Sequence, residues 1–134
     1  MKLLLDTHIA LWAISDSKRL RDDVRALLES EKNDVFYSMA SVWEIAIKRK
    51  LHPDQMPMDE DVFVSLCEQT GFDRLDIKLP HIFELKKLAR QDSAPRHNDP
   101  FDRILIAQAK TESMTLITHD SLLAGYGEKC VTTV

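Results

Sequence analysis

This chain of 134 residues has few cysteines, few glycines, no long apolar run and no excess of basic charge. Its two cysteines, Cys67 and Cys130, lie far apart without C-x-x-C spacing, so we expect reduced, buried thiols and neither a disulfide framework nor a redox motif. The Leu3–Leu5 run is too short for a signal-peptide core, and no segment approaches the length of a membrane span. These absences predict a soluble, cytoplasmic protein with no membrane partner.

The formal net charge of the chain is -4 at pH 7. An acidic balance argues weakly against a nucleic-acid partner, because such partners usually meet a basic surface. The chain also has no internal repeat, low-complexity tract or long linker, and its length is enough to bury one core. We therefore expect a single domain over residues 1–134.

Apolar runs that suit strands alternate along the chain with segments of helical periodicity. The run Lys2–Leu5 is almost wholly apolar and stops at Asp6, which is typical of a strand buried on both faces of a parallel sheet. The alternation predicts an α/β fold, a three-layer α/β/α arrangement around a mostly parallel sheet of about five strands. The other expected strands are Val35–Ser38, Phe72–Ile77, Thr115–Thr118 and Cys130–Val134. Helices are expected at residues 9–14, 20–28, 41–50, 59–70, 80–89, 99–109 and 121–124.

A helix start with two acidic residues stands out in the segment His97–Arg103. Asp99 occupies the expected N-cap position, Pro100 the first helical position, and Asp102 the first turn. Capping needs only one acidic side chain, so the second carboxylate suggests that a cation is held there. Because the cap explains Asp99, we assign the ligand role to Asp102.

Four acidic side chains are expected at one edge of the sheet. Asp6 and Asp120 follow predicted strands, while Glu44 and Asp102 lie near the starts of predicted helices. In open α/β sheets the binding crevice lies outside the carboxyl ends of the strands. Four converging carboxylates stay charged only around cations, and oxygen ligands favour Mg²⁺ or Mn²⁺. This combination predicts metal-assisted hydrolysis of a phosphodiester bond, with all four residues as catalytic metal ligands.

Simpler interpretations exist for these carboxylates taken singly. Asp6 could merely end a strand, and Glu44 could complete a capping box with Ser41 at the start of its helix. The four carboxylates together account for the whole net charge, so bound metal would make the chain less hostile to RNA than its charge suggests.

The whole chain resembles a PIN-domain ribonuclease of the VapC type, the toxin of a type II toxin–antitoxin pair. The resemblance is carried by Leu4-Leu5-Asp6-Thr7-His8, Ser41-Val42-Trp43-Glu44-Ile45-Ala46-Ile47-Lys48, His97-Asn98-Asp99-Pro100-Phe101-Asp102-Arg103 with Ala107-Gln108-Ala109, and Ile117-Thr118-His119-Asp120. Many relatives have Asn at position 8, so His8 places the chain in an Asp-Thr-His sub-branch.

The resemblance has implications for fold, activity and partners. It implies a parallel sheet of order 3-2-1-4-5, a divalent metal ion at the four acidic positions, and cleavage of RNA, often tRNA or rRNA. It also implies a cognate VapB-like antitoxin that inserts a segment toward the acidic site, and a homodimer.

Several neighbours of the four carboxylates are candidates for supporting roles. Histidines near the acidic motifs could be ligands, proton donors or supporting partners, and we favour a supporting or substrate-contacting role. Hydroxyl groups could hydrogen-bond the carboxylates, and arginines beside the motif could touch a phosphate backbone. For both tryptophans we favour core packing over base stacking. For the basic clusters we favour a position at solvated helix faces and ends. These residues are Thr7, His8, Ser41, Arg96, His97, Arg103, Thr118 and His119, with Trp12 and Trp43, and the clusters Lys48-Arg49-Lys50 and Lys86-Lys87.

Three rival functions have different requirements. A dinuclear metallophosphoesterase needs glycine-containing clusters, and Gly71, Gly125 and Gly127 lie in none of them. A phosphoaspartate phosphatase needs a second Asp at position 8, which is His8. A non-catalytic PIN-like module that binds RNA or protein is the remaining alternative, and the intact acidic quartet argues against it.

Overall fold

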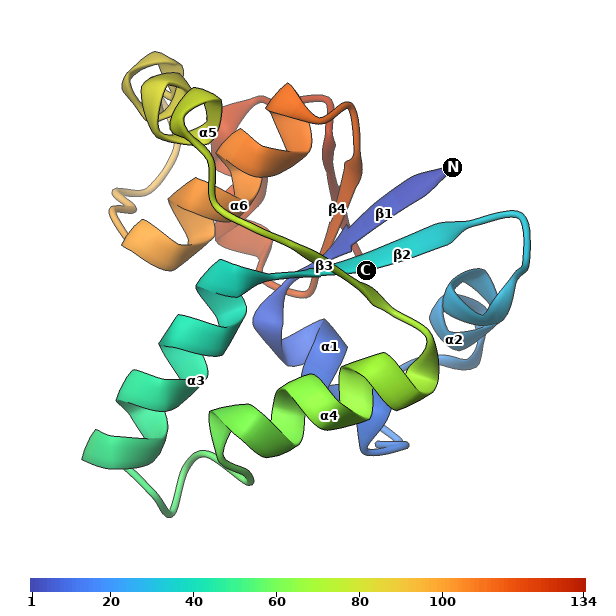
Figure 1. Ribbon diagram of the computed structural model, residues 1–134. Helices are drawn as coiled ribbons and strands as arrows, with labels where there is room; N and C mark the ends of the chain where they lie inside the picture. The colour runs from blue at the N-terminus through green and yellow to red at the C-terminus, as the bar shows by residue number, and fades with distance from the viewer.

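A five-stranded parallel sheet forms the centre of the computed structural model, which describes residues 1–134 (Figure 1). Its strand order is β3-β2-β1-β4-β5, and every neighbouring pair is parallel. The predicted α/β class and the strand order 3-2-1-4-5 are therefore confirmed. The strands are β1 (Lys2–Leu5), β2 (Asp34–Ser38), β3 (Asp73–Leu75), β4 (Thr115–Thr118) and β5 (Val131–Thr133).

Strand β1 lies in the middle of the sheet and is buried on both faces. Leu3, Leu4 and Leu5 have no exposed surface, as the continuous apolar run predicts. Because side chains alternate along a strand, Leu3 and Leu5 join the apolar cluster on one face while Leu4 joins the cluster on the other. Strand β1 therefore contributes side chains to both halves of the core.

Helices cover both faces of the sheet (Figure 1). One face is covered by α1 (Thr7–Ile14), α2 (Asp22–Glu29) and α4 (Glu60–Thr70), and the other by α6 (Pro100–Thr111). Helix α3 (Met39–Leu51) projects from the end of β2. The short helix α5 (Leu79–Glu84) packs on α6, followed by the 3-10 turn η1 (Leu85–Lys87), and a second 3-10 segment, η2 (Ser121–Tyr126), follows β4.

The expected capping box at Ser41 is wrong. Helix α3 begins at Met39, directly after β2, and the hydroxyl of Ser38 caps it by accepting a hydrogen bond from the Ala40 N–H at 3.0 Å. Ser41 lies inside the helix and is buried. The helix therefore starts two residues before the predicted Ser41, with Met39 and Ala40 in its first turn. Since Ser38 is the N-cap, Glu44 is too far along the helix to complete a capping box.

Three further details differ from the sequence-based expectation. Trp43 is 59% exposed, so its predicted core packing is wrong, whereas Trp12 is half-buried against the apolar cluster. Val62, whose apolar helical spacing within residues 59–70 predicts burial, is also exposed on α4. The helix expected at residues 80–89 ends as an α-helix at Glu84. It continues as the 3-10 turn η1, after which Leu88 has an extended backbone.

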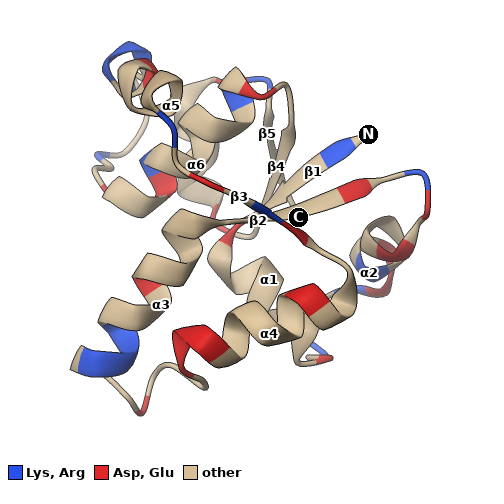
Figure 2. Ribbon diagram, in the orientation of Figure 1, with Lys and Arg blue, Asp and Glu red and all other residues tan.

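Charges at helix ends follow the expected pattern (Figure 2). Lys48, Arg49 and Lys50 lie in the last turn of α3, where the helix dipole favours cations. Gly71 ends α4 with a φ of 91°, a left-handed conformation that glycine adopts without strain. Asp59 occupies the N-cap position of α4, but its carboxylate pairs with Arg49 at 2.8 Å instead of capping.

Cys67 is buried and Cys130 is partly buried, and both are free thiols. None of the helices combines the length and apolar character that a membrane crossing requires.

Candidate active site

Asp6 and Asp120 follow β1 and β4, which are adjacent in the sheet. Because parallel strands end at the same edge, the two carboxylates are carried to one rim. The Thr118 hydroxyl joins them: it donates to the Asp6 carboxylate and accepts a hydrogen bond from the Asp120 N–H at 3.0 Å. Asp6 is 6% exposed, whereas Asp120 remains half-exposed and also caps η2.

Glu44 reaches the same rim from the second turn of α3. Its Oε1 accepts a hydrogen bond from the Thr7 hydroxyl at 2.6 Å, and that hydroxyl lies 2.8 Å from the Ser41 hydroxyl. Its Oε2 accepts from the Lys48 ammonium group at 2.7 Å. Both carboxylate oxygens of Glu44 therefore have donors, although the residue is only 5% exposed.

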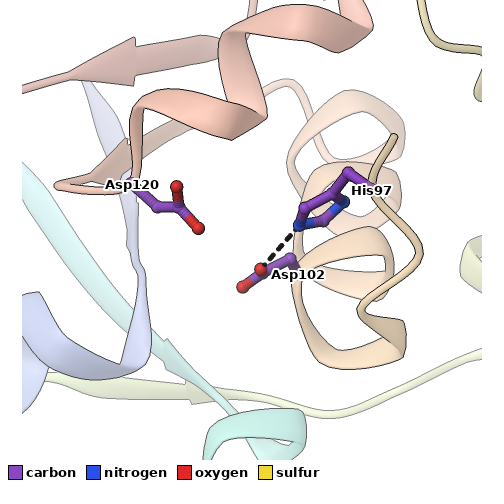
Figure 3. Close-up of side chains that lie close together, drawn as sticks. All are labelled: His97, Asp102 and Asp120. Atoms are coloured by element: carbon purple, nitrogen blue, oxygen red, sulfur yellow. Dashed lines mark hydrogen bonds and ion pairs between the residues drawn. The ribbon is translucent and has the colours of Figure 1, made fainter. Parts of the chain in front are cut away.

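Asp102 enters from the first turn of α6. The Asp99 carboxylate accepts hydrogen bonds from the N–H groups of Phe101 and Asp102, so Asp99 is the N-cap that the sequence predicts. The Asp102 side chain is left free to face the rim. There its Oδ2 lies 3.1 Å from His97 Nε2, with the Asp120 carboxylate across from the pair (Figure 3).

His97 is held in a fixed orientation by Tyr126. The Tyr126 O–H donates to the His97 carbonyl at 3.0 Å, and the Tyr126 oxygen lies 2.8 Å from His97 Nδ1. Because the single phenolic proton is used on the carbonyl, the Nδ1–H donates to the phenolic oxygen. The other ring nitrogen, Nε2, is thereby aimed at the Asp102 carboxyl group, 3.1 Å away.

The electrostatics of the rim make the Asp102 carboxyl group hard to ionise. Burial raises the pKa of Asp102 to about 8, with further contributions from the negative charges of Asp6, Asp99, Glu44 and Asp120. Burial also raises the pKa of Asp6, opposed by the Thr118 hydrogen bond and the nearby His8. Asp102 is therefore within electrostatic reach of the other three predicted carboxylates, Asp6, Glu44 and Asp120.

A divalent cation fits this donor set. Ligand atoms of His97, Asp102 and Asp120 all lie within 4.8 Å of one another, and the remaining donors of the rim are carboxylate oxygens. Oxygen-rich sites suit Mg²⁺ and Mn²⁺, and one imidazole is compatible with Mn²⁺. A carboxyl group that is hard to ionise without a counter-charge is the expected signature of such a site.

The supporting residues divide into engaged and free side chains. Arg103, expected near a phosphate, instead donates to the Leu85 carbonyl at 3.0 Å and lies over the Tyr126 ring. Arg96 and His8 are exposed. His119 is exposed and its Nδ1 lies 2.9 Å from the Val134 carbonyl.

Two residues of the rim were missed from sequence. Lys48 was interpreted as part of a solvated helix end, although its i,i+4 spacing from Glu44 could have predicted the ion pair. No local signal marks Tyr126 as the partner of His97, because 29 residues separate them along the chain.

Comparison with known proteins assigns the family. The model of the PIN domain matches residues 3–129, so the chain belongs to the PIN domain family. No curated protein sequence matches the chain.

Solved structures share the fold at low sequence identity. VapBC2 from Rickettsia felis, bound to a DNA fragment from its promoter, has a chain with 17% identity and a TM-score of 0.62, covering 90% of this chain and 89% of that one. FitAcB from Neisseria gonorrhoeae has a chain with 21% identity and a TM-score of 0.62, and the match covers 98% of this chain and 96% of that one. A domain of a functionally unknown protein from Methanocaldococcus jannaschii has 13% identity and a TM-score of 0.59, and the match covers 99% of this chain and 90% of that one.

Proposed function

We propose that the protein is a divalent-metal-dependent endoribonuclease, the VapC-type toxin of a toxin–antitoxin pair, with a single PIN domain over residues 1–134. The observation that carries the proposal is the rim, where ligand atoms of His97, Asp102 and Asp120 lie within 4.8 Å of one another and where Asp6 and Glu44 are within electrostatic reach of Asp102. Such a cluster is poorly suited to a purely structural role, because buried like charges destabilise the fold.

The four carboxylates would hold the metal, with His97 beside Asp102. At these residues Mg²⁺ or Mn²⁺ would supply a positive charge for a scissile phosphate and would make a water molecule more acidic. The hydroxyl groups of Thr7 and Thr118 orient Glu44 and Asp6, so that these carboxylates stay fixed in the site. The proposed substrate is RNA, with tRNA or rRNA as candidates from the family resemblance.

The proposed partner is a VapB-like antitoxin. Structural similarity to VapBC2 supports it, and the resemblance to VapC-type toxins further suggests a homodimer in the cytoplasm.

A cleavage assay tests the proposed function. Purified protein is incubated with total RNA and with transcribed tRNA in Mg²⁺ or Mn²⁺, with excess chelator as a control, and the same reactions are run with Asp102→Asn. We expect new RNA ends only in the metal-containing reactions of the wild-type protein. Absence of cleavage with either metal would favour the alternative, a PIN-like module that only binds RNA or protein.

A further inference from the structure

A cavity opens beside the acidic rim on its α1 side. It has a volume of about 350 Å³ and is lined by Asp6, His8, Trp12, Arg19, His119 and Asp120, and we call it the Trp12 cavity. Two of these residues, Asp6 and Asp120, belong to the rim itself. The cavity therefore begins where the proposed chemistry takes place and extends away from it.

The other residues of the Trp12 cavity are an aromatic ring and three nitrogen-bearing side chains. Trp12 is half-buried, which fixes its indole ring, and His119 meets that ring edge-on with 5.2 Å between centroids. His8 flanks the same ring at 6.2 Å. The Arg19 side chain is exposed and makes no hydrogen bond or ion pair, so its five donors are available.

We propose that the Trp12 cavity is the subsite for the nucleotide next to the scissile phosphate, with its base on Trp12 and its phosphate on Arg19. The inference rests on the proposed function, since it assumes an RNA strand at the rim. A strand with one phosphate at Asp6 and Asp120 must carry a neighbouring nucleotide into an adjoining space, and this cavity shares both carboxylates. Fixed aromatic rings combined with cationic side chains are the usual means of binding single-stranded nucleic acid.

The groove continues beyond this nucleotide. A second cavity of about 250 Å³ shares His8, Trp12 and Arg19 with the first. Trp12 and Arg19 therefore lie between two hollows, in the position from which they can contact successive units of a strand. A protein segment is the competing occupant, and a basic one would be attracted to Asp6 and Asp120 but repelled by Arg19.

The test measures RNA binding without cleavage. The protein carries Asp102→Asn, which should abolish cleavage, and Trp43→Phe, which leaves Trp12 as the only tryptophan. The fluorescence of Trp12 is followed during titration with single-stranded oligouridylate and oligoadenylate of about ten nucleotides in excess Mg²⁺, which offsets the charge of the rim. We expect saturable quenching of Trp12. In the matched protein Trp12→Phe, which keeps an aromatic ring and leaves Trp43, we expect binding by anisotropy of labelled RNA with little change in fluorescence.

Charge at the subsite is tested with neighbouring basic residues. Arg19→Ala should weaken RNA binding about fivefold or more and lower the slope of log affinity against log salt by about 1. Lys18→Ala is the control, because Lys18 is exposed beside Arg19 but lines neither cavity, and should have a smaller effect. Trp12→Leu should weaken binding about fivefold to a hundredfold relative to Trp12→Phe, with thermal unfolding confirming that both variants are folded.

Several results would overturn the subsite. Unchanged Trp12 fluorescence at saturating RNA would do so, as would equal losses in Arg19→Ala and Lys18→Ala. Quenching by an oligoarginine peptide but not by RNA would assign the cavity to a protein segment. The proposed function is judged separately by metal-dependent cleavage. Cleavage without a Trp12 response refutes only the subsite, whereas a Trp12 response to RNA without cleavage refutes the nuclease and leaves the cavity as a site that only binds RNA.

Discussion

The two sides of the acidic rim are built differently. On the α6 side, Arg90, His97, Arg103 and Tyr126 form what we call the Tyr126 cluster, in which both guanidinium groups lie over the tyrosine ring and donate to backbone carbonyls. On the α1 side, the Trp12 cavity is open and Arg19 has no partner. On the α6 side the polar groups bind one another and hold His97 beside Asp102. On the α1 side the polar side chain of Arg19 is available to a ligand.

This difference suggests a division of labour within the site. Groups that hold a metal ligand must be fixed before the substrate arrives, because disorder there would weaken both metal binding and catalysis. Groups that bind a strand gain from being unpaired, since a paired group must first give up its internal contact. The following predictions test that division.

The largest expected effect is the loss of cleavage on removal of one rim carboxylate. Asp102→Asn or Asp6→Asn should lower the rate of RNA cleavage by about a thousandfold or more, because each substitution removes a negative charge from the metal site with little change in volume. The rate is measured under single-turnover conditions in Mn²⁺.

Asp99→Asn is the matched control, because it also removes an acidic charge at the start of α6 while asparagine still caps a helix well. It should keep most of the activity. Equal losses in Asp99→Asn and Asp102→Asn would mean that Asp102 acts only through the general charge of the helix start.

The stability of the metal-free protein should fall as the pH rises. Asp102 has a pKa of about 8 in the folded protein against an ordinary value of 3.8, so the folded state binds the proton more tightly than the unfolded state does. The unfolding free energy therefore decreases from about pH 4 to about pH 8, and Asp6, whose pKa is also raised, acts in the same direction. Thermal unfolding in chelator measures this decrease.

Asp102→Asn should reduce this pH dependence and raise the melting temperature at pH 8, because the uncharged amide needs no counter-ion. Added Mn²⁺ should restore stability to the wild type at the same pH. The account holds that the ionised Asp102 carboxylate destabilises the metal-free protein. A melting temperature that is lower in Asp102→Asn than in the wild type at pH 8 without metal would contradict it.

Breaking the Tyr126 cluster should have an intermediate effect. Tyr126→Phe removes the hydroxyl that fixes both His97 Nδ1 and the His97 carbonyl, so we expect metal affinity and cleavage to fall about tenfold. The aromatic ring remains for Arg90 and Arg103 to pack against. Isothermal titration with Mn²⁺ gives the affinity, and an unchanged affinity would show that the cluster does not position Asp102.

The smallest expected effect concerns Lys48. Lys48→Met removes a half-exposed cation from Glu44 and from the rim, so Mn²⁺ affinity should increase about twofold to fivefold. Lys50→Met, at the exposed end of the same helix, is the control and should change the affinity less. Weaker Mn²⁺ binding in Lys48→Met would mean that the ammonium group holds Glu44 in its ligand position.

Much of the fold was predictable because local patterns and burial agree. The apolar run Leu3–Leu5 has only one comfortable place in an α/β protein, the middle of the sheet. Asp99 followed by Pro100 marks the start of α6 by capping chemistry alone. Ser38 and Ser41 can both cap a helix. The capping-box spacing between Ser41 and Glu44 predicted Ser41, whereas Ser38 is the actual N-cap.

The candidate site was predictable only in its charges. Strand ends and helix starts lie at one edge, and from this rule the four carboxylates were expected there; the structure groups the ligand atoms of two of them, Asp102 and Asp120, with His97. Periodicity did not show that Trp43 is exposed, because an apolar residue at helical spacing fits a core and a surface contact equally well.

Contacts between distant segments left no pattern in the sequence. Arg90 approaches so close to Gly125 that a Cβ there would lie 2.5 Å from its guanidinium carbon, and only the folded chain reveals this requirement. The Tyr126 cluster and the Trp12 cavity both depend on such contacts.

Mn²⁺ binding followed by electron paramagnetic resonance at about pH 8, the pKa of Asp102, tests the metal site most directly. The wild-type protein and Asp99→Asn should show saturable binding, and the affinity should fall at least about tenfold in Asp6→Asn and Asp102→Asn. Equal binding by all four proteins would contradict a metal ion held by the acidic rim.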